Sequence, residues 1–344
     1  MASHRRPKQQ SRARVTVLTT AAAAAVVLSA NAANAAPSQK LSKDQVKAKV
    51  DDLYQQAEQA TEKFNGAKEK QQKLQKDIST IQDNVARGQQ DLNKLRDGLG
   101  SLATSQYRSG GIDPSVQLFL SSNPNDFLDK ASTLDQLSAQ QVDALKKIQD
   151  KQRELSQERA EATQKLKDLS ATRAQLEQNK KDVQGKLADA QKLLNSLTAK
   201  EKADLAAQQQ RADRSSSQRV DLGNTPPASG RAAAAFAAAQ SQIGKPYVYG
   251  ATGTASYDCS GLTSWAYAQA GISIPRTSQE QATIGTRISS VNDLQVGDLV
   301  FFYGDIHHVG LYAGNGQVLH APHTGADVRY EAMSDMPFQF GVRV

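Results

Sequence analysis

The chain has 344 residues, which is enough for two or three domains, and a formal net charge of +7 at pH 7. Five basic residues and no acidic ones lie within residues 1–35, whereas residues 231–344 hold six basic and eight acidic residues. No basic patch interleaved with aromatic residues occurs, so the composition argues against a nucleic-acid-binding protein. Aromatic residues make up 5% of the chain and gather in its last third, where we expect the globular core.

Residues 1–35 are predicted to be a secretory signal. A basic start precedes the apolar run 15–28, which is too short to span a bilayer, and small residues at 30–32 and 33–35 fit cleavage sites. We expect cleavage after Ala35 and a secreted, extracellular protein. An uncleaved anchor is the less favoured alternative, and Arg5 and Arg6 leave open whether export follows the general or the twin-arginine route.

Residues 38–207 are predicted to form a coiled-coil hairpin. Apolar residues recur three and four apart from Val46 to Leu102, and again from Leu145 to Leu197, with a few polar residues on the second seam. A Gly pair and two prolines interrupt the helical pattern in a connector at residues 108–132. Two helices of similar length around one break predict an antiparallel pair.

The connector carries apolar residues whose partner the sequence does not identify. Two interpretations remain open, namely a small helical cap on the hairpin tip and a docking surface for another protein. The residues concerned are Val116, Leu118, Phe119, Leu120, Phe127 and Leu128.

Residues 208–230 are predicted to be a flexible linker, because they are polar, rich in serine and contain two prolines. Residues 231–344 follow as the globular domain. It opens with an Ala-rich helix over residues 231–243, which Gly244 ends.

Cys259 is the only cysteine of the chain. In an exported protein, structural cysteines come in pairs, so a single one is either a small buried apolar residue or a reactive thiol. Helical spacing after it places Cys259 in the first turn of a helix that stops at Gly271. Unpaired backbone N–H groups there are expected to lower the pKa of the thiol.

Two histidines are predicted to meet on a β-hairpin downstream. Strands over 308–313 and 317–321 flank the turn 314–316, and a three-residue loop makes Gly310 face His320. His308 then shares a face of the sheet with His320. A two-residue loop of Asn315 and Gly316 would put the two rings on opposite faces.

Together these residues make a nucleophile, a base and a side chain that orients the base. His308 would take the proton of Cys259, His320 would hold the ring of His308, and Tyr247 would help to bind an oxyanion. His307 points to the other face, and His323 lies in a loop. No metal-binding spacing is present, so we expect neither a metal nor a cofactor.

Several motifs in the last 110 residues resemble the NlpC/P60 peptidases of bacterial cell walls. The resemblance implies a papain-like α+β fold, with Cys259 as nucleophile, His308 as base, His320 as third member and Tyr247 near the oxyanion site. The motifs are KPYVYG at 245–250, YDCSGL at 257–262, IPRTS at 274–278, LQVGDLVFF at 294–302, HVGLY at 308–312 and GNGQVLHA at 314–321.

The same resemblance implies a substrate. Many members cut the bond between D-γ-glutamyl and the diamino acid of the peptidoglycan stem peptide, and Asp258, Ser260 and Arg276 are candidate contacts to its charged groups. Arg276 could instead pair with a surface acid. Two other functions remain open, namely a wall amidase or transpeptidase on this fold, and a coiled-coil division scaffold without activity.

The predicted hairpin resembles, more loosely, the coiled coils of PcsB-type secreted cell-wall hydrolases. That resemblance implies cell-wall localisation and control by a membrane division complex of the FtsEX type. Because the long hairpin is joined to the globular domain by a mobile linker, we also expect the hairpin, or its apolar connector, to cover the groove of Cys259 until a membrane partner moves it.

Overall fold

A computed structural model describes residues 41–108, 116, 124–218 and 221–344. The predicted signal, residues 1–35, lies outside the described residues, and so do Leu118, Phe119, Leu120 and the side chains of Phe127 and Leu128. Val116, the remaining apolar residue of the connector, is 47% exposed. None of the described helices combines the length and the apolar character that crossing a bilayer requires.

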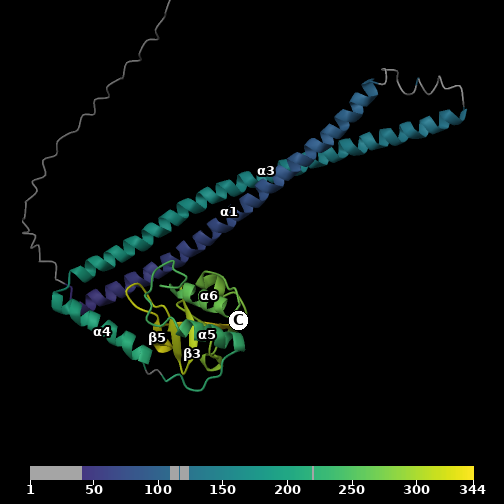
Figure 1. Cartoon of the computed structure of the whole chain (residues 1–344). Helices are drawn as coiled ribbons and strands as arrows, with labels where there is room; N and C mark the ends of the chain where they lie inside the picture. Colours follow the sequence, from purple (N-terminus) through teal and green to yellow (C-terminus); the bar gives the residue numbers. More distant parts are fainter. Residues whose placement is uncertain (1–40, 109–115, 117–123, 219–220) are drawn as a thin grey trace, which may run out of the picture. The chain divides into compact units, whose positions relative to one another are not determined.

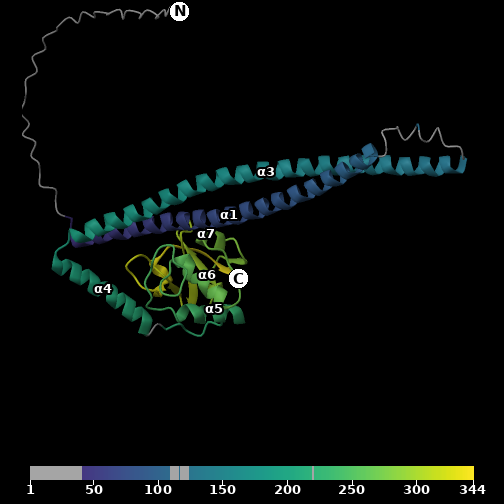
Figure 2. The ribbon, with the colours of Figure 1, turned by 45° about the horizontal axis from the view of Figure 1, so that its top comes forward.

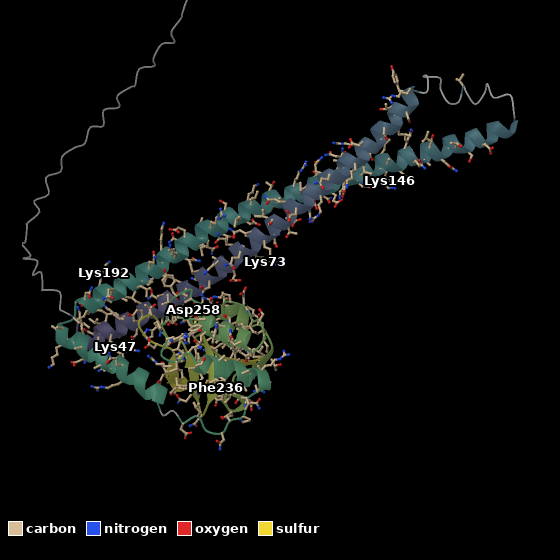
Figure 3. The ribbon with its side chains drawn as sticks, in the orientation of Figure 1. Lys47, Lys73, Lys146, Lys192, Phe236 and Asp258 are labelled. Atoms are coloured by element: carbon tan, nitrogen blue, oxygen red, sulfur yellow. The ribbon has the colours of Figure 1, made fainter. Side chains whose placement is uncertain are left out.

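Two long helices, α1 (Lys43–Arg108) and α3 (Pro124–Asn195), run antiparallel as predicted (Figures 1 and 2). Cross-helix pairs show the direction, because Lys165 lies 3.0 Å from Asp77 and Arg159 lies 3.1 Å from Gln89. Much of the predicted seams is buried between the helices, although Leu145 and Leu166 of the second seam are 51% and 50% exposed, whereas lysines such as Lys73 project from the outer faces (Figure 3). The buried seam residues include Val46, Val50, Ala57, Ala67, Leu74, Ile78, Ile81, Leu92, Leu155, Leu169, Val183 and Ala190.

A third helix, α4 (Ala199–Gln218), follows a break at residues 196–198. Thr198 and Glu201 form a capping box at its start, in which the Glu201 N–H donates to Thr198 Oγ1 and the Thr198 N–H donates to Glu201 Oε2. The first half of the predicted linker, residues 208–218, is therefore helical. The polar composition concealed this, because Ala and Gln are also good helix formers.

The globular domain also begins earlier than predicted. Pro227 forms a bridge with Val296, the Ala228 N–H donates to Val296 O, and Leu222 packs against the core. Residues 221–229 thus lie on the domain that was expected to start at residue 231.

The domain is α+β, as predicted. A six-stranded antiparallel sheet has the strand order β1-β6-β2-β3-β4-β5, with helices packed on one face. The elements are α5 (Gly230–Gln240), α6 (Cys259–Gln269), α7 (Ser278–Gln281), β1 (Thr286–Ile288), β2 (Leu299–Phe302), β3 (His308–Gly314), β4 (Gln317–His320), β5 (Arg329–Ala332) and β6 (Phe338–Arg343), with 3-10 turns at Val291–Asp293 and Met333–Asp335.

The two faces of the sheet bury different apolar sets. Helices α5 and α6 cover one face, where Phe236, Leu262 and Tyr267 meet Phe301 and Leu311. A smaller cluster on the other face contains Val300, Phe302, Tyr312, Val318 and Met333. Contacts between α6 and β3 fix the start of α6 over the sheet.

The turn between β3 and β4 differs from the prediction, although its consequence holds. Gly314 pairs with Gln317, so the loop has two residues, Asn315 and Gly316, and both have positive φ. A bulge between Tyr312 and Gly314 supplies the missing residue and restores the expected pairing further along, with Leu311 opposite Leu319. The two histidines consequently lie on the same face.

Candidate active site

Cys259 is the first residue of α6 and is 1% exposed. Asp258 caps the helix, because its Oδ1 accepts the Gly261 N–H at 2.7 Å. Only a glycine fits at 261, since a Cβ there would lie 2.1 Å from the carbonyl oxygen of Ala251. The cap and this close approach fix the direction in which Cys259 leaves the backbone.

His308 and His320 meet across β3 and β4. His308 Nε2 lies 2.7 Å from His320 Nδ1, and His320 Nε2 lies 3.2 Å from Glu331 Oε2. If Glu331 accepts the His320 Nε2–H, then His320 Nδ1 accepts the His308 Nε2–H. The Nδ1 atom of His308 is then left without a proton, as a general base requires.

Glu331 was not predicted as part of the site. Burial opposes its charge, but the hydrogen bond from His320 and the ion pair with Arg329, at 2.7 Å, hold its pKa well below the ordinary value. The residue lies on β5, beyond the recognised motifs. Its role as the acceptor that orients His320 follows only from the pairing of β4 with β5.

The α1 helix occupies the groove beside Cys259. Glu62 accepts hydrogen bonds from Ser260 Oγ at 2.7 Å, from the Ser278 N–H at 2.7 Å and from Ser278 Oγ at 3.0 Å. Its Oε1 lies 3.8 Å from Cys259 Sγ. We expected the hairpin or its connector to cover the groove. In the structure α1 of the hairpin covers it, through the contacts of Glu62 with Ser260, Ser278 and Cys259.

Two neighbours of Glu62 extend this contact. Asn65 donates to Asp258 Oδ2 at 3.1 Å, and Glu58 Oε2 lies 3.3 Å from His308 Nδ1. Glu58, Glu62, Asn65 and Thr61 share one face of α1 and are all buried. This buried polar face of α1 (Glu58, Thr61, Glu62 and Asn65) is distinct from the apolar seam toward α3.

The predicted substrate contacts lie together beneath this face. Arg276 donates to Asp258 Oδ2 at 2.6 Å and to Ser260 Oγ at 2.8 Å. Asp258 is fully buried, so Arg276 does not pair with a surface acid. The cluster binds a carboxylate and an amide N–H, both supplied here by α1.

The pKa of the thiol differs from the sequence-based expectation. Burial is the main cause that raises the pKa of Cys259 well above its ordinary value, and the carboxyl groups of Glu62, Asp258 and Glu58 raise it further when they are ionised. The helix start contributes too little to reverse this, because α1 removes water and brings two more carboxyl groups. With α1 in place, Cys259 is a protonated thiol.

His308 is likewise held in one form. Burial, with a further contribution from His307, lowers the pKa of His308 to about 3, and burial lowers the pKa of His320 to about 4. Within the described part of the chain, Cys259 Sγ contacts Glu62 and the carbonyl of His307, and no hydrogen bond joins it to His308. No thiolate–imidazolium pair exists in this arrangement.

The Tyr247 hydroxyl is buried and has no hydrogen-bond partner among the described residues. Burial and the nearby Cys259 raise the pKa of Tyr247 well above the ordinary value, so it stays a donor. An unsatisfied buried hydroxyl is costly, and such groups often mark functional sites. Its position near the thiol suits a donor to an oxyanion.

The two remaining histidines of the domain contact aromatic rings. His307 stacks on Tyr303 with 4.3 Å between ring centroids, and His323 stacks on Tyr54 of α1 at 4.9 Å. A cavity of about 1000 Å³ between α1, α4 and the sheet edge is lined by His308, among others, but not by Cys259. Among the described residues, no group of three or more His, Cys, Asp or Glu side chains could hold a metal ion.

The fold and this arrangement define the class of the domain as a papain-like α+β domain. Residues 244–341 match the model of the NlpC/P60 family, and this segment is an NlpC/P60 domain, as its motifs suggested.

Known relatives resemble the same part of the chain. A Corynebacterium glutamicum protein named a probable endopeptidase is 50% identical over 117 residues, which cover 34% of this chain and 56% of that protein. The p60 protein of Listeria monocytogenes, also named a probable endopeptidase, is 49% identical over 98 residues, covering 28% of this chain and 20% of its own. The chain thus spans about half the length of the first relative and less of the second.

Among solved structures, the NlpC/p60 domain of the peptidoglycan hydrolase SagA is 36% identical, with a TM-score of 0.32, over 33% of this chain and 98% of that one. The Resuscitation Promoting Factor Interacting protein RipA, in a form mutated at C383, is 29% identical, with a TM-score of 0.30, over 36% of this chain and 70% of that one.

Proposed function

We propose that the chain is a secreted, cell-wall-associated cysteine endopeptidase that hydrolyses the peptidoglycan stem peptide. The NlpC/P60 domain and the relatives named probable endopeptidases support this function. The observation that carries it is a buried thiol at a helix start, 3.7 Å from the backbone carbonyl oxygen of His307, whose neighbour His308 is held through His320 and Glu331.

The reaction follows from these positions once α1 has left the groove. His308 Nδ1 takes the thiol proton, and Cys259 Sγ attacks the peptide carbonyl carbon. The oxyanion accepts hydrogen bonds from the Tyr247 hydroxyl and from backbone N–H groups at the start of α6. His308 then gives its proton to the leaving amine, and water hydrolyses the thioester.

The bond we propose is the one between D-γ-glutamyl and the diamino acid. A γ-linked glutamyl residue keeps a free α-carboxylate close to the bond that is cut. Ser260 and Ser278 bind a carboxylate of α1 3.8 Å from the sulfur, and Asp258 accepts an amide N–H. These contacts support a substrate that presents an acid group beside the scissile carbonyl.

Digestion of purified sacculi, followed by mass spectrometry of the fragments, tests this function. New carboxyl groups on D-glutamate support the endopeptidase, whereas freed lactyl groups indicate an amidase and newly formed cross-links a transpeptidase. The Cys259→Ala variant is the matched control. If it digests the wall as fast as the wild type, Cys259 is not the nucleophile and the proposal fails; if neither protein digests the wall, the result favours the binding scaffold.

We further propose that a membrane division complex of the FtsEX type binds the hairpin and draws α1 out of the groove. The length of the hairpin and its loose resemblance to PcsB-type hydrolases support this partner. Co-purification of the complex with the full chain, but not with a chain whose residues 108–132 are replaced by a Gly-Ser segment, would test it.

A further inference from the structure

The contact between α1 and the groove contains two carboxyl groups, one helical turn apart. Glu58 and Glu62 are 7% and 3% exposed, and both face the residues that would carry out catalysis. A buried carboxylate is strongly destabilising unless a cation or several donors compensate it. What compensates these two groups determines when α1 can stay in place.

Among the described residues, no cation forms an ion pair with Glu62. The guanidinium of Arg276 acts on Glu62, but it is paired with Asp258 at 2.6 Å. Cys259 adds no positive charge, and Asp258 adds a negative one. Three carboxyl groups and one guanidinium therefore share this part of the interface, counting Glu58.

The hydroxyl groups around Glu62 tolerate either protonation state. The one hydroxyl proton of Ser278 can point to the Ile306 carbonyl oxygen at 2.6 Å in place of Glu62, and that of Ser260 can point to Asp258 Oδ1 at 3.4 Å. Either hydroxyl can therefore turn a lone pair toward Glu62 and accept a hydrogen bond from its protonated carboxyl group. The pocket accommodates a neutral carboxylic acid without losing a hydrogen bond.

Glu58 faces the rings of His308, which burial keeps uncharged, and of His307, whose Nδ1 contacts the Asp305 carboxylate. Its Oε2 lies 3.3 Å from His308 Nδ1 and 4.0 Å from His307 Nε2. Since the chain of hydrogen bonds through His320 leaves His308 Nδ1 unprotonated, two acceptors stand 3.3 Å apart unless Glu58 carries a proton. His323, Glu331 and Asp258 are the other titratable groups that act on Glu58.

We propose that α1 is a proton-dependent latch, in which Glu58 and Glu62 enter the catalytic groove as neutral carboxylic acids and their ionisation releases the helix. Burial is the main cause that raises the pKa of Glu58 to about 8 and that of Glu62 to about 7. As a regulation of the catalytic groove, the latch rests on the proposed function.

The sign of the pH dependence follows from these directions. Because both pKa values are higher with α1 docked than with α1 free, docking takes up protons. The latch is strongest at a pH low enough that Glu58 and Glu62 are protonated both when α1 is docked and when it is free. It weakens as the pH rises from the ordinary carboxyl pKa of 4.5 toward about 7 for Glu62 and about 8 for Glu58.

Other titratable groups at the interface affect the docking of α1 at lower and at higher pH than the two glutamates do. Histidines whose pKa is lowered by burial, His308 and His320, oppose docking below their ordinary pKa of 6.5. The thiol of Cys259, whose pKa is raised, favours docking until the pH nears its ordinary pKa of 9.0. Between these limits the two glutamates dominate.

The lone cysteine provides a readout that needs no peptidoglycan. The labelling rate of Cys259 with a dithiodipyridine, a thiol reagent that reacts even in mild acid, is measured on the full mature chain. The same rate in Glu62→Trp, whose side chain is too large for the pocket, gives the rate of the uncovered thiol. At each pH, the labelling rate in Glu62→Trp divided by the rate in the wild type gives the protection of Cys259 by α1.

We expect protection in the wild type to fall at least about tenfold between about pH 6.5 and about pH 8.5. In Glu58→Gln/Glu62→Gln, which imitates the protonated acids, protection should change by less than about threefold over that range. The single variants Glu58→Gln and Glu62→Gln should each show part of the fall in protection that the wild type shows as the pH rises. Glu69→Gln, on the exposed side of α1, should follow the wild type.

Three results would overturn the latch. They are protection that stays constant with pH in the wild type, protection that falls equally in the double glutamine variant, and labelling of Glu62→Trp no faster than that of the wild type. Circular dichroism confirms that each variant is folded. Because labelling is independent of hydrolysis, a chain that digests no wall but shows this pH dependence refutes the proposed function and not the latch.

Discussion

The two buried faces of α1 are held by different chemistry. Toward α3, residues such as Leu74 and Ile78 form an apolar seam, whereas toward the groove Glu58, Glu62 and Asn65 are buried as polar groups. Burial of apolar surface stabilises at any pH, but buried carboxyl groups depend on protons and on their donors. Helix α1 thus has two kinds of buried contact. We call the apolar seam toward α3 its permanent face, because that contact does not depend on pH. We call the buried polar face toward the groove (Glu58, Thr61, Glu62 and Asn65) its conditional face, because that contact depends on protonation.

The largest effect is expected at the base that the conditional face covers. His308→Ala should lower peptidoglycan hydrolysis at least about 1000-fold, because the thiol loses its proton acceptor. Fragment release from sacculi measures this. Retention of more than about a tenth of the activity, in a variant with an unchanged melting temperature, would remove His308 from the mechanism.

Tyr247→Phe should separate catalysis from stability. Loss of the oxyanion donor is expected to lower hydrolysis about 100-fold. The same change removes a buried hydroxyl without a partner, so stability should rise by about 1 kcal/mol. Urea unfolding and hydrolysis assays on one preparation test both; a loss of stability would mean that the hydroxyl is bonded after all.

Breaking the conditional face alone should activate the enzyme. Glu62→Trp is expected to raise hydrolysis at least about tenfold at mildly acidic pH, because α1 no longer fits the groove and the substrate gains access. Glu69→Trp, on the exposed side of the same helix, is the matched control and should leave the rate unchanged. Equal rates for the two variants would show that α1 does not limit access.

His320 is expected to act through the ring of His308. His320→Ala should lower hydrolysis about tenfold to 100-fold, whereas His320→Asn should retain more, since an amide can still accept the His308 Nε2–H. The pH profile of hydrolysis separates this role from a structural one. An identical profile and rate for both variants would contradict it.

The smallest effect on catalysis is expected from the permanent face. Leu74 packs with Ile78 and Leu169, so Leu74→Ala should destabilise the hairpin by about 2–4 kcal/mol. Because this cluster lies beyond the segment that enters the groove, labelling of Cys259 should change less than about twofold. Thermal unfolding and thiol labelling measure the two quantities; strong deprotection would mean that the two faces are coupled.

The sequence predicted the permanent face and the domain for physical reasons. Apolar residues at heptad spacing indicate a seam, and the helix that begins at Cys259 and the strands around the histidines follow from local patterns. The NlpC/P60 motifs are confirmed by the family match over residues 244–341.

The conditional face could not be predicted. Glu58, Glu62 and Asn65 lie at helical spacing among other polar residues, a pattern that is usually a solvated surface. Only their tertiary contacts distinguish them: Glu62 binds Ser260 and Ser278, Glu58 contacts His308, and Asn65 donates to Asp258. For the same reason the raised pKa of the thiol was missed, because it depends on a helix about 200 residues earlier in the chain.

The turn after β3 is a further feature that could not be predicted from the sequence. The spacing of the histidines was interpreted correctly with the wrong loop, since a two-residue turn plus a bulge at Ala313 gives the same register as a three-residue loop. Local turn signals do not distinguish these two solutions.

Chemical linking of α1 to the nucleophile tests the central claim most directly. In Glu62→Cys, the new thiol replaces a carboxyl group that lies 3.8 Å from Cys259 Sγ. A bis-methanethiosulfonate with a two-carbon bridge should join residues 62 and 259 within one chain, as peptide mass spectrometry would detect, while Glu69→Cys should not be joined to Cys259. Separate labelling of both thiols in Glu62→Cys, or equal linking in the two variants, would contradict the placement of α1 in the catalytic groove.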